Sequence, residues 1–312
     1  MHRPRIVVVG SSNTDMVVKS RRIPRVGETV VGGQFVMAAG GKGANQAVAA
    51  ARLGAEVTFV AKVGQDMFGD QAIAGYTREG IDTRFVFRDP DHATGVALIM
   101  VDEQGENLIS VASGANHHLG PADVDQAADA IRQAEVLVVQ LETPLATVLH
   151  AARLAHAAGV RVILDPAPAP AEPLPRELLS AVTCIKPNET EAQRLTGLAV
   201  EDEHSARQAA EELVRQGATS AIVTLGARGA VWLEGGQWGF VPGFRVEALD
   251  STAAGDAFSG ALACALARRM PLAEATRYAC LAAALSVTRM GAQPSLPTAE
   301  EVERFGRQVS AD

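Results

Sequence analysis

The chain has 312 residues, of which 47% are hydrophobic and 21% are charged, a balance typical of a soluble globular protein with a sizeable core. Its net charge of -8, without a run of basic residues, argues against a nucleic-acid partner, because DNA and RNA select a basic surface. The first apolar run, Ile6 to Val9, is too short for a signal peptide or a membrane span. Three cysteines without a CxxC pair argue against disulfides and zinc, so we expect a cytoplasmic protein.

The first part of the chain is predicted to mix short strands with helices. Four consecutive β-forming residues before Gly10 indicate a buried strand, and an alanine-rich run closed by Gly54 indicates a helix. The predicted elements are a strand at 5–10, β-like stretches at 15–19 and 28–37, a helix at 43–53, a strand at 56–63, a helix at 68–79, and β-like stretches at 95–101 and 107–112.

From residue 121 onward, strands alternate regularly with helices. We predict helices at 121–133, at 144–158, from Asn188, from His204, at 255–269 and at 272–290, with strands at 136–140, 160–164, 182–185 and 220–225. This alternation favours a parallel sheet with helices on both faces. The β-like stretches near 15–37 and 95–112 do not fit it, and we expect them to form a small accessory sheet, a candidate lid.

Four glycine-bearing segments are candidates for ligand binding, at 40–45, 224–229, 252–256 and 291–295. The first precedes a helix whose free N–H groups could hold an oxygen-rich ligand, although for a glycine cluster taken alone a simple tight turn is the more common explanation. It is not a phosphate-binding Walker loop, because Gly43 stands where that motif needs Ser or Thr. No G-x-G-x-x-G follows the first strand, so the folds that use these two loops are disfavoured.

The segment at 252–256 carries the sharpest chemical hypothesis. Its small residues leave several N–H groups exposed before a helix, as an anion hole for a phosphoryl group requires. Asp256 in the same turn could accept the proton of an attacking hydroxyl. The alternative is an ordinary helix start, in which an acidic residue is favoured by the helix dipole.

Polar side chains follow several predicted strands. They are Asn13, Asp15, Glu142, Asn188 and Glu191. Each taken singly is better explained by a helix cap or a surface position. In an open α/β sheet, however, ligands bind at the carboxyl ends of the strands, so their repeated placement favours a common site.

Together these segments resemble the ribokinase family of carbohydrate kinases. The matching segments run nearly from end to end, at 10–15, 40–50, 114–116, 140–142, 187–191, 224–226, 241–244, 253–256 and 291–295. The glycine-rich segments around 41 and 255 correspond to the family's paired signatures. The resemblance implies one domain over 1–312, a three-layer α/β/α sandwich with a mostly parallel sheet. It also implies a β lid formed by about 14–38 and 94–112, through which two copies pair as a homodimer.

The resemblance further implies a reaction, the ATP-dependent phosphorylation of D-ribose at O5 to D-ribose 5-phosphate and ADP, with Mg²⁺ and an activating K⁺. Carried over by position, the sugar would be bound by Asn13, Thr14, Asp15, Gly41, Lys42, Gly43, Ala44, Asn45, Glu142 and Asp256. Asp256 would be the base, and the anion hole would be formed by Ala253, Ala254 and Gly255.

The nucleotide and metal positions follow from the same resemblance. ATP would contact Asn188, Glu191, Thr224, Leu225, Gly226, Ala227, Arg228, Gly229, Gly255, Asp256 and Cys280, and Glu191 would serve Mg²⁺ indirectly. K⁺ would lie among Asp250, Thr252, Ser286, Arg289, Gly291 and Ser295. Two positions depart from the family pattern: Cys280 replaces a nucleotide-contacting His, and Met290 replaces a Lys.

Two other functions compete with this interpretation. The first is a kinase of the same fold for another sugar or a nucleoside. A nucleoside pocket needs aromatic side chains to stack on the base, but Trp232, Trp238, Tyr76 and Tyr278 lie outside the matched sugar segments, and only Phe35 and Phe87 fall near the candidate lid. The second is a non-catalytic sugar sensor, which would not need to keep Asp256.

Overall fold

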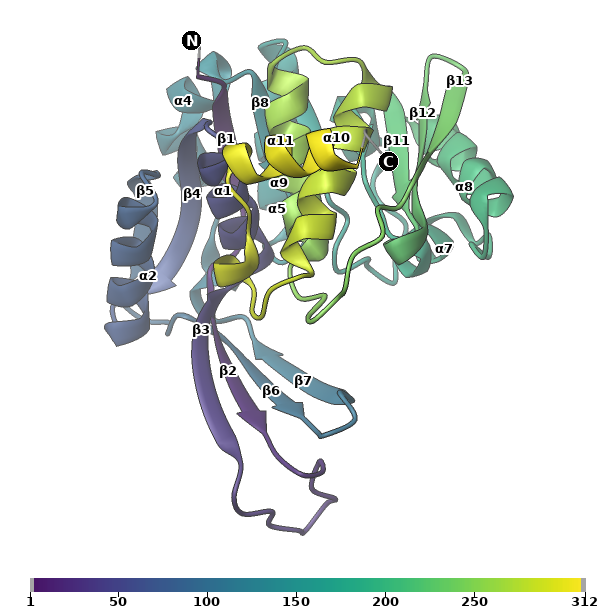
Figure 1. The fold of residues 1–312 in the computed structure, drawn as a ribbon. Coiled ribbons are helices and arrows are strands. Elements are labelled where there is room, and N and C mark those ends of the chain that lie inside the picture. The colour runs from purple at the N-terminus through teal and green to yellow at the C-terminus, as the bar shows by residue number, and fades with distance from the viewer. Residues whose placement is uncertain (1–2, 310–312) are drawn as a thin grey trace.

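The computed structural model describes residues 3–309, and its largest element is a nine-stranded sheet (Figure 1). In sequence order, the strands are β1 (Arg5–Val9), β4 (Glu56–Gly64), β5 (Asp82–Asp89), β8 (Val136–Val139), β9 (Arg161–Leu164), β10 (Cys184–Ile185), β11 (Ser220–Thr224), β12 (Gly229–Glu234) and β13 (Gln237–Pro242). Their order across the sheet is β13-β12-β11-β10-β9-β8-β1-β4-β5. The strands from β11 to β5 in this order run parallel, and β12 and β13 add an antiparallel hairpin at one edge.

Helices cover both faces of this sheet, as the alternation predicted. Strand β1 shows why: Ile6 and Val8 point into one buried cluster, and Val7 and Val9 point into the other. The first cluster receives α1 (Lys42–Arg52), α2 (Met67–Arg78), α9 (Ala254–Ala267), α10 (Leu272–Ser286) and α11 (Ala299–Gln308). The second receives α3 (Pro121–Gln126), α4 (Ala128–Gln133), α5 (Leu145–Ala157), α6 (Arg176–Ala181), α7 (Glu189–Thr196) and α8 (Glu203–Gln216). The predicted three-layer sandwich is therefore confirmed.

A second, four-stranded sheet projects from this body (Figure 1). We call it the small sheet; it comprises β2 (Asn13–Lys19), β3 (Gln34–Gly40), β6 (Gly95–Val101) and β7 (Asn107–Ala112), in the order β3-β2-β6-β7. The expected accessory sheet is thus present. The stretch predicted at 28–37 is displaced, because residues 28–33 form no strand and β3 continues to Gly40.

Several elements were not predicted from the sequence, and some predicted helix ends differ from the observed ones. Strand β5, helices α6 and α11, and the hairpin of β12 and β13 were not predicted. The helix expected at 121–133 is interrupted at Ala127, where α3 ends and α4 begins. The last long helix ends at Ser286 rather than at 290. Within residues 3–309, no helix has both the length and the apolar character needed to cross a bilayer.

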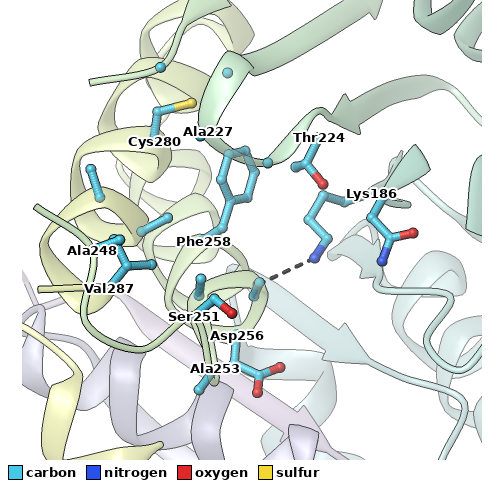
Figure 2. Close-up of a pocket in the computed structure, with 18 of the residues that line it drawn as sticks. Lys186, Thr224, Ala227, Ala248, Ser251, Ala253, Asp256, Phe258, Cys280 and Val287 are labelled. Atoms are coloured by element: carbon cyan, nitrogen blue, oxygen red, sulfur yellow. Dashed lines mark hydrogen bonds between the residues drawn. The ribbon is translucent and has the colours of Figure 1, made fainter. Parts of the chain in front are cut away.

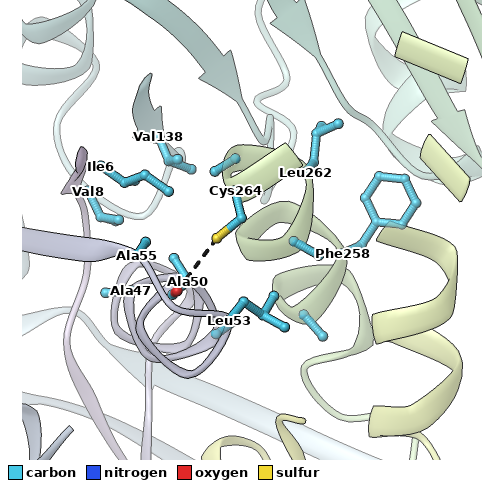
Figure 3. Packing of buried hydrophobic residues seen from close by; sticks show 14 of the residues in the cluster. Ile6, Val8, Ala47, Ala50, Leu53, Ala55, Val138, Phe258, Leu262 and Cys264 are labelled. Atoms are coloured by element: carbon cyan, nitrogen blue, oxygen red, sulfur yellow. Dashed lines mark hydrogen bonds between the residues drawn. The ribbon is translucent and has the colours of Figure 1, made fainter. Parts of the chain in front are cut away.

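The packing of α1 against α9 fixes the position of the site (Figure 3). A Cβ at Gly260 would lie 2.5 Å from the Cβ of Ala49, so only glycine permits this close approach. One turn further along, the Cys264 thiol donates to the carbonyl of Ala50 at 3.5 Å. This contact brings the beginnings of the two helices together at the carboxyl ends of the strands.

Candidate active site

A cavity of about 900 Å³ opens at the carboxyl ends of β9, β10 and β11 (Figure 2). The start of α9 forms one wall, and the segment 243–251 together with α10 forms another. Polar and charged side chains gather at the end near α1 and α9. The opposite end is mostly apolar, lined by Phe244, Val246, Ala248, Ala283 and Val287, with the exposed Arg245 among them. A ligand with a charged part and a flat apolar part matches this division.

Asp256 lies in the first turn of α9 and is only 5% exposed. The side chain of Asn45 donates to its Oδ2 at 2.9 Å, and that of Gln46 donates to its Oδ1 at 3.0 Å. Burial raises the pKa of Asp256 to about 6; the Lys42 ammonium lowers it, and the Asp165 carboxylate raises it. A carboxyl group poised near neutral pH and held in one orientation is suited to accept a proton.

The residues before Asp256 lead into the first turn of α9, where the N–H of Ala254 donates to the carbonyl of Ser251 at 3.2 Å. Ala253 adopts a left-handed conformation with φ of 61°, which costs a non-glycine residue about 1 kcal/mol or more. The helix then begins at Ala254, and the N–H groups of a first turn have no intrahelical acceptor. Ala253, Ala254 and Gly255 all line the cavity, as the predicted anion hole requires.

Charged groups predicted for sugar binding converge beside Asp256. The Glu142 carboxylate accepts from the backbone N–H of Lys42 at 3.0 Å and from the Ser11 hydroxyl. Burial raises the pKa of Asp15 to about 6, and the charges of Glu142 and Asp256 add to the effect. Burial disfavours the Lys42 ammonium, but the surrounding carboxylates, Asp256 foremost, raise its pKa above the ordinary value. The carboxylates therefore stabilise the charge of Lys42, whereas burial and the neighbouring carboxylates disfavour the charge of Asp15.

A second cavity of about 360 Å³ adjoins this region and is lined by Asn13, Asn116, His117 and Glu142. The Asn116 amide donates to Asn13 Oδ1 at 2.7 Å and so orients it. Other predicted sugar residues do not line either cavity: Thr14, Asp15, Gly41, Gly43, Ala44 and Asn45. Gly43 and Ala44 pack inward instead, and a Cβ at Gly43 would lie 2.5 Å from the backbone nitrogen of Ser11.

The predicted nucleotide residues divide into two groups. Thr224, Gly226, Ala227, Gly229, Asn188, Glu191 and Cys280 line the large cavity. Leu225 and Arg228 do not, because Leu225 is buried in the core and Arg228 pairs with Glu189 and with the carbonyl of Glu201. Burial raises the pKa of the Cys280 thiol to about 12, so this side chain is a neutral, apolar part of the wall.

Asn188 and Glu191 form a reciprocal cap at the start of α7. The Asn188 side chain accepts from the Glu191 N–H, and the Glu191 side chain accepts from the Asn188 N–H, each at 2.9 Å. Burial raises the pKa of Glu191, and the Asp165 carboxylate adds to the effect. A cation near Glu191 would offset this cost, so its environment fits a nearby divalent ion.

The predicted potassium residues lie in the loop at 250–252 and in the segment from the end of α10 to residue 295. Asp250 joins them, because its carboxylate accepts from Thr252 at 2.9 Å and from the Gly291 N–H at 2.8 Å. Ser286 and Ser295 donate their hydroxyls to nearby carbonyls. The Arg289 side chain pairs with Glu301, so only its carbonyl could serve a cation. The loops thus offer carbonyl and hydroxyl oxygens, which are the ligands of hard cations.

Sequence reasoning missed several polar residues that complete the site. Lys186 and Asp165 line the large cavity, Gln46 contacts Asp256, and Ser11 contacts Glu142. A signal for two of them was present, because Asp165 and Lys186 directly follow predicted strands, as the other candidate residues do. Gln46 adjoins Asn45 in the first turn of α1, but only the packing of α1 on α9 gives it a partner.

Three comparisons relate this chain to known proteins. The sequence model of the pfkB family of carbohydrate kinases matches residues 3–299. A ribokinase of Haemophilus influenzae is 45% identical over 303 residues, which cover 97% of this chain and 98% of that protein. A deoxyribokinase of Salmonella typhi is 40% identical over 304 residues, covering 96% and 98%. A structure of Arabidopsis thaliana ribokinase complexed with ribose and ATP superposes with a TM-score of 0.90 at 33% identity, covering 97% of this chain and 99% of that one.

The resemblance seen in the sequence is therefore confirmed at full length. The fold, with its nine-stranded sheet and separate small sheet, matches that of a solved ribokinase. The relatives include enzymes named for ribose and for deoxyribose, so they agree on a sugar as the substrate. The chain belongs to the pfkB family of carbohydrate kinases, which use ATP to phosphorylate sugars.

Proposed function

We propose that this kinase transfers the γ-phosphoryl group of ATP to O5 of D-ribose, giving D-ribose 5-phosphate and ADP. The observation that carries the proposal is Asp256, a buried carboxyl group at the start of a helix, beside both the N–H groups of 253–255 and the polar cluster of Asp15, Lys42 and Glu142. The similarity to the Haemophilus influenzae ribokinase supports ribose as the sugar.

In this reaction O5 attacks the γ-phosphorus as the bond from that phosphorus to the β-phosphate oxygen breaks. The O5 proton passes to Asp256, and ADP leaves. The N–H groups of Ala253, Ala254 and Gly255 would stabilise the charge on the transferring group. Because such transition states are loose, positioning and charge neutralisation supply most of the rate, and this is what a rigid helix start offers.

The metals are part of the proposal. Mg²⁺ bound to the phosphates would neutralise their charge, and Glu191 and Asn188 would hold it largely through water. K⁺ would lie between the loop of Asp250 and Thr252 and the loop of Gly291, where it would stabilise the start of α9. Exchanging K⁺ for Na⁺ is therefore expected to lower kcat, and equal rates in the two salts would remove K⁺ from the proposal.

We also propose that the small sheet, with bounds near 14–38 and 94–112, acts as a lid and pairs two copies. Exclusion of water would suppress wasteful ATP hydrolysis. Support comes from large apolar side chains on this sheet that are exposed in the single chain, namely Val18, Phe35, Val36, Met37, Leu98, Leu108, Ile109 and Val111.

Sedimentation tests the pairing. Phe35→Glu is expected to shift the protein from dimer to monomer, because Phe35 is 62% exposed in the single chain. Leu198→Glu is the control, since Leu198 is 40% exposed at the end of α7, away from the small sheet. A wild-type monomer, or an unchanged dimer in Phe35→Glu, would contradict pairing through this sheet.

An acceptor panel tests the substrate. The enzyme, with ATP and Mg²⁺, is assayed on ribose, 2-deoxyribose, adenosine and fructose 6-phosphate. Ribose is expected to give a kcat/KM at least about tenfold above the others. The second candidate is 2-deoxyribose, because the Salmonella typhi deoxyribokinase is nearly as similar. Binding of ribose without any turnover would instead identify a sugar sensor.

A further inference from the structure

A buried ion pair lies in the large cavity, formed by two residues that the proposed mechanism does not use. Asp165 follows β9 and Lys186 follows β10, and the parallel pairing of these strands sets the two side by side. The ammonium of Lys186 lies 3.1 Å from Asp165 Oδ2, and the two side chains are 4% and 3% exposed. Removing two charges from water costs free energy, so the presence of a buried ion pair in this cavity needs an explanation.

The ammonium of Lys186 also reaches the beginning of α9. It donates to the carbonyl of Gly255 at 3.3 Å, and Figure 2 shows the side chain extending across the cavity toward this turn. The ring of Phe258 lies beneath it, with 5.9 Å between the nitrogen and the ring centroid. The cation is therefore held next to the N–H groups that form the proposed anion hole.

The charges that line the cavity indicate a role for the Lys186 ammonium. The lining carries four carboxylates, Asp165, Glu189, Glu191 and Asp256, and these would repel a polyphosphate. Lys42 offers a positive charge from the α1 side, and Arg245 is exposed at the other end. Among the described residues that line the cavity, Lys186 is the buried cation on the sheet side of α9. Its ammonium has three donors, one more than the two partners that it has here.

A glutamine connects this pair to Asp256. The Gln46 amide donates to Asp165 Oδ2 at 2.8 Å and to Asp256 Oδ1 at 3.0 Å, so both its hydrogens are used. Its own oxygen accepts from Gln140 at 2.7 Å, which fixes the orientation of the amide. The proton acceptor and the cation thus share one network of buried hydrogen bonds.

We propose that Lys186 is a catalytic residue that binds the phosphoryl group during its transfer. In this proposal Asp165 and Gln46 are positioning residues that fix the side chains of Lys186 and Asp256 relative to each other. The proposal rests on the proposed function, since it assigns Lys186 to the phosphate of that reaction. Lys186 stays protonated throughout, and the O5 proton goes to Asp256. A fixed positive charge in a dry site stabilises charge on the transferring oxygens without reorganisation.

The first test compares nucleotides with and without a γ-phosphate. Lys186→Met is expected to weaken binding of the β,γ-imido analogue of ATP by about tenfold or more, to leave ADP affinity within about threefold, and to lower kcat by about 100-fold or more. The matched control is Lys62→Met, because Lys62 forms a similar pair with Asp123 at 2.7 Å outside the lining of both cavities. Unchanged kcat and unchanged analogue affinity in a folded Lys186→Met protein would overturn the proposal.

A second variant distinguishes a loss of function from misfolding, because Lys186→Met leaves the Asp165 carboxylate buried without its partner. The double variant Lys186→Met/Asp165→Asn removes both charges, and circular dichroism checks its fold. It is expected to show the same loss of kcat and of analogue affinity, and wild-type values would refute the role of Lys186. If the wild-type enzyme phosphorylates no sugar, the proposed function fails, yet the contrast between the ATP analogue and ADP still decides whether Lys186 binds the γ-phosphate.

The positioning role of Asp165 is tested by the pH dependence of kcat. Asp256 is faced by Lys42, Asn45 and Gln46 from α1, by Asp165 from the end of β9, and by Asp15 from β2. The Asp165 carboxylate raises the pKa of Asp256, so Asp165→Asn is expected to move the acid limb of kcat to lower pH. A lower kcat with an unmoved acid limb would remove Asp165 from this role.

Discussion

Replacing Asp256 by Asn is expected to lower kcat and to raise the stability of the folded protein, so one variant tests both roles of this side chain. The change removes the proton acceptor, so kcat is expected to fall by about 10²–10⁴-fold, which corresponds to about 3–5 kcal/mol of transition-state stabilisation. Binding of ribose should stay near normal, because the new side chain keeps the size and most of the hydrogen bonds of the old one. Asn45 helps, since its Oδ1 has no partner in the structure and can turn to accept from the new amide.

The same change is expected to stabilise the folded protein at neutral pH. Burial raises the pKa of Asp256 from 3.8 to about 6, so the folded state binds this proton more tightly than the unfolded chain does. The resulting stability is fully present below pH 3.8 and is lost as the pH rises through about 6. At pH 7 the ionised carboxylate therefore costs up to about 3 kcal/mol, and Asn, which cannot ionise, avoids this cost.

Urea unfolding of both proteins at pH 7 and below pH 3.8 measures the difference, and steady-state kinetics measure kcat. The stability gain of Asp256→Asn should be present at pH 7 and should vanish at the lower pH. Asp129→Asn is the control, because Asp129 is exposed on α4 and outside the site. A kcat within about tenfold of wild type would remove Asp256 as the base. A lower stability of Asp256→Asn at pH 7 would refute the assigned cost of burying the charge.

Three further predictions follow from the same contacts. The wild-type kcat is expected to rise with pH through about 6, because Asp256 accepts a proton only when ionised, and a flat profile over this range would contradict that role. Asp15→Asn is expected to raise the KM for ribose by about tenfold or more while the KM for ATP stays unchanged; a parallel rise in both constants would contradict a specific sugar contact. Gly43→Ala is expected to destabilise the protein by about 1–3 kcal/mol, because its Cβ would lie 2.5 Å from the Ser11 nitrogen. Gly75→Ala is the matched helix control, with no atom nearer than 3.8 Å, and is expected to stabilise by about 0.5–1 kcal/mol in thermal unfolding; equal effects of the two changes would contradict the packing.

The layered fold could be predicted because local patterns express it. The alternation of strands with helices depends on periodicity, which the sequence shows directly. The missed elements carry weaker patterns. Strand β5 lies at the edge of the sheet and reads Asp-Thr-Arg-Phe-Val-Phe-Arg-Asp, with charges at both ends, and helix α11 is mostly polar, with only Val302 fully buried. Such elements form because of the residues they pack against, and those tertiary contacts leave no pattern in the local sequence.

The site residues show a similar division. Asp256, Asn13 and Glu142 stand where the sequence suggested, because each follows or begins a regular element whose position was predicted. Neither Thr14 nor Asp15 lines a cavity, but successive residues of a strand point to opposite faces, and Asp15 is the one close to the charges of Glu142 and Asp256. Carrying a motif over residue by residue ignores this alternation, so the assignment of Thr14 and Ala44, which line neither cavity, to the sugar stays a prediction.

What the sequence could not supply is the contact between α1 and α9, on which the chemistry depends. Gly260 and Ala49 are far apart along the chain, and their close approach sets how near Asn45 and Gln46 come to Asp256. A wider spacing of these helices would break both hydrogen bonds, which hold the carboxylate in one orientation, and would let water compete for it, so the base would no longer be fixed in place for proton transfer. The small residues in the middle of the two helices are therefore as much a condition of proton transfer as the polar residues at their ends.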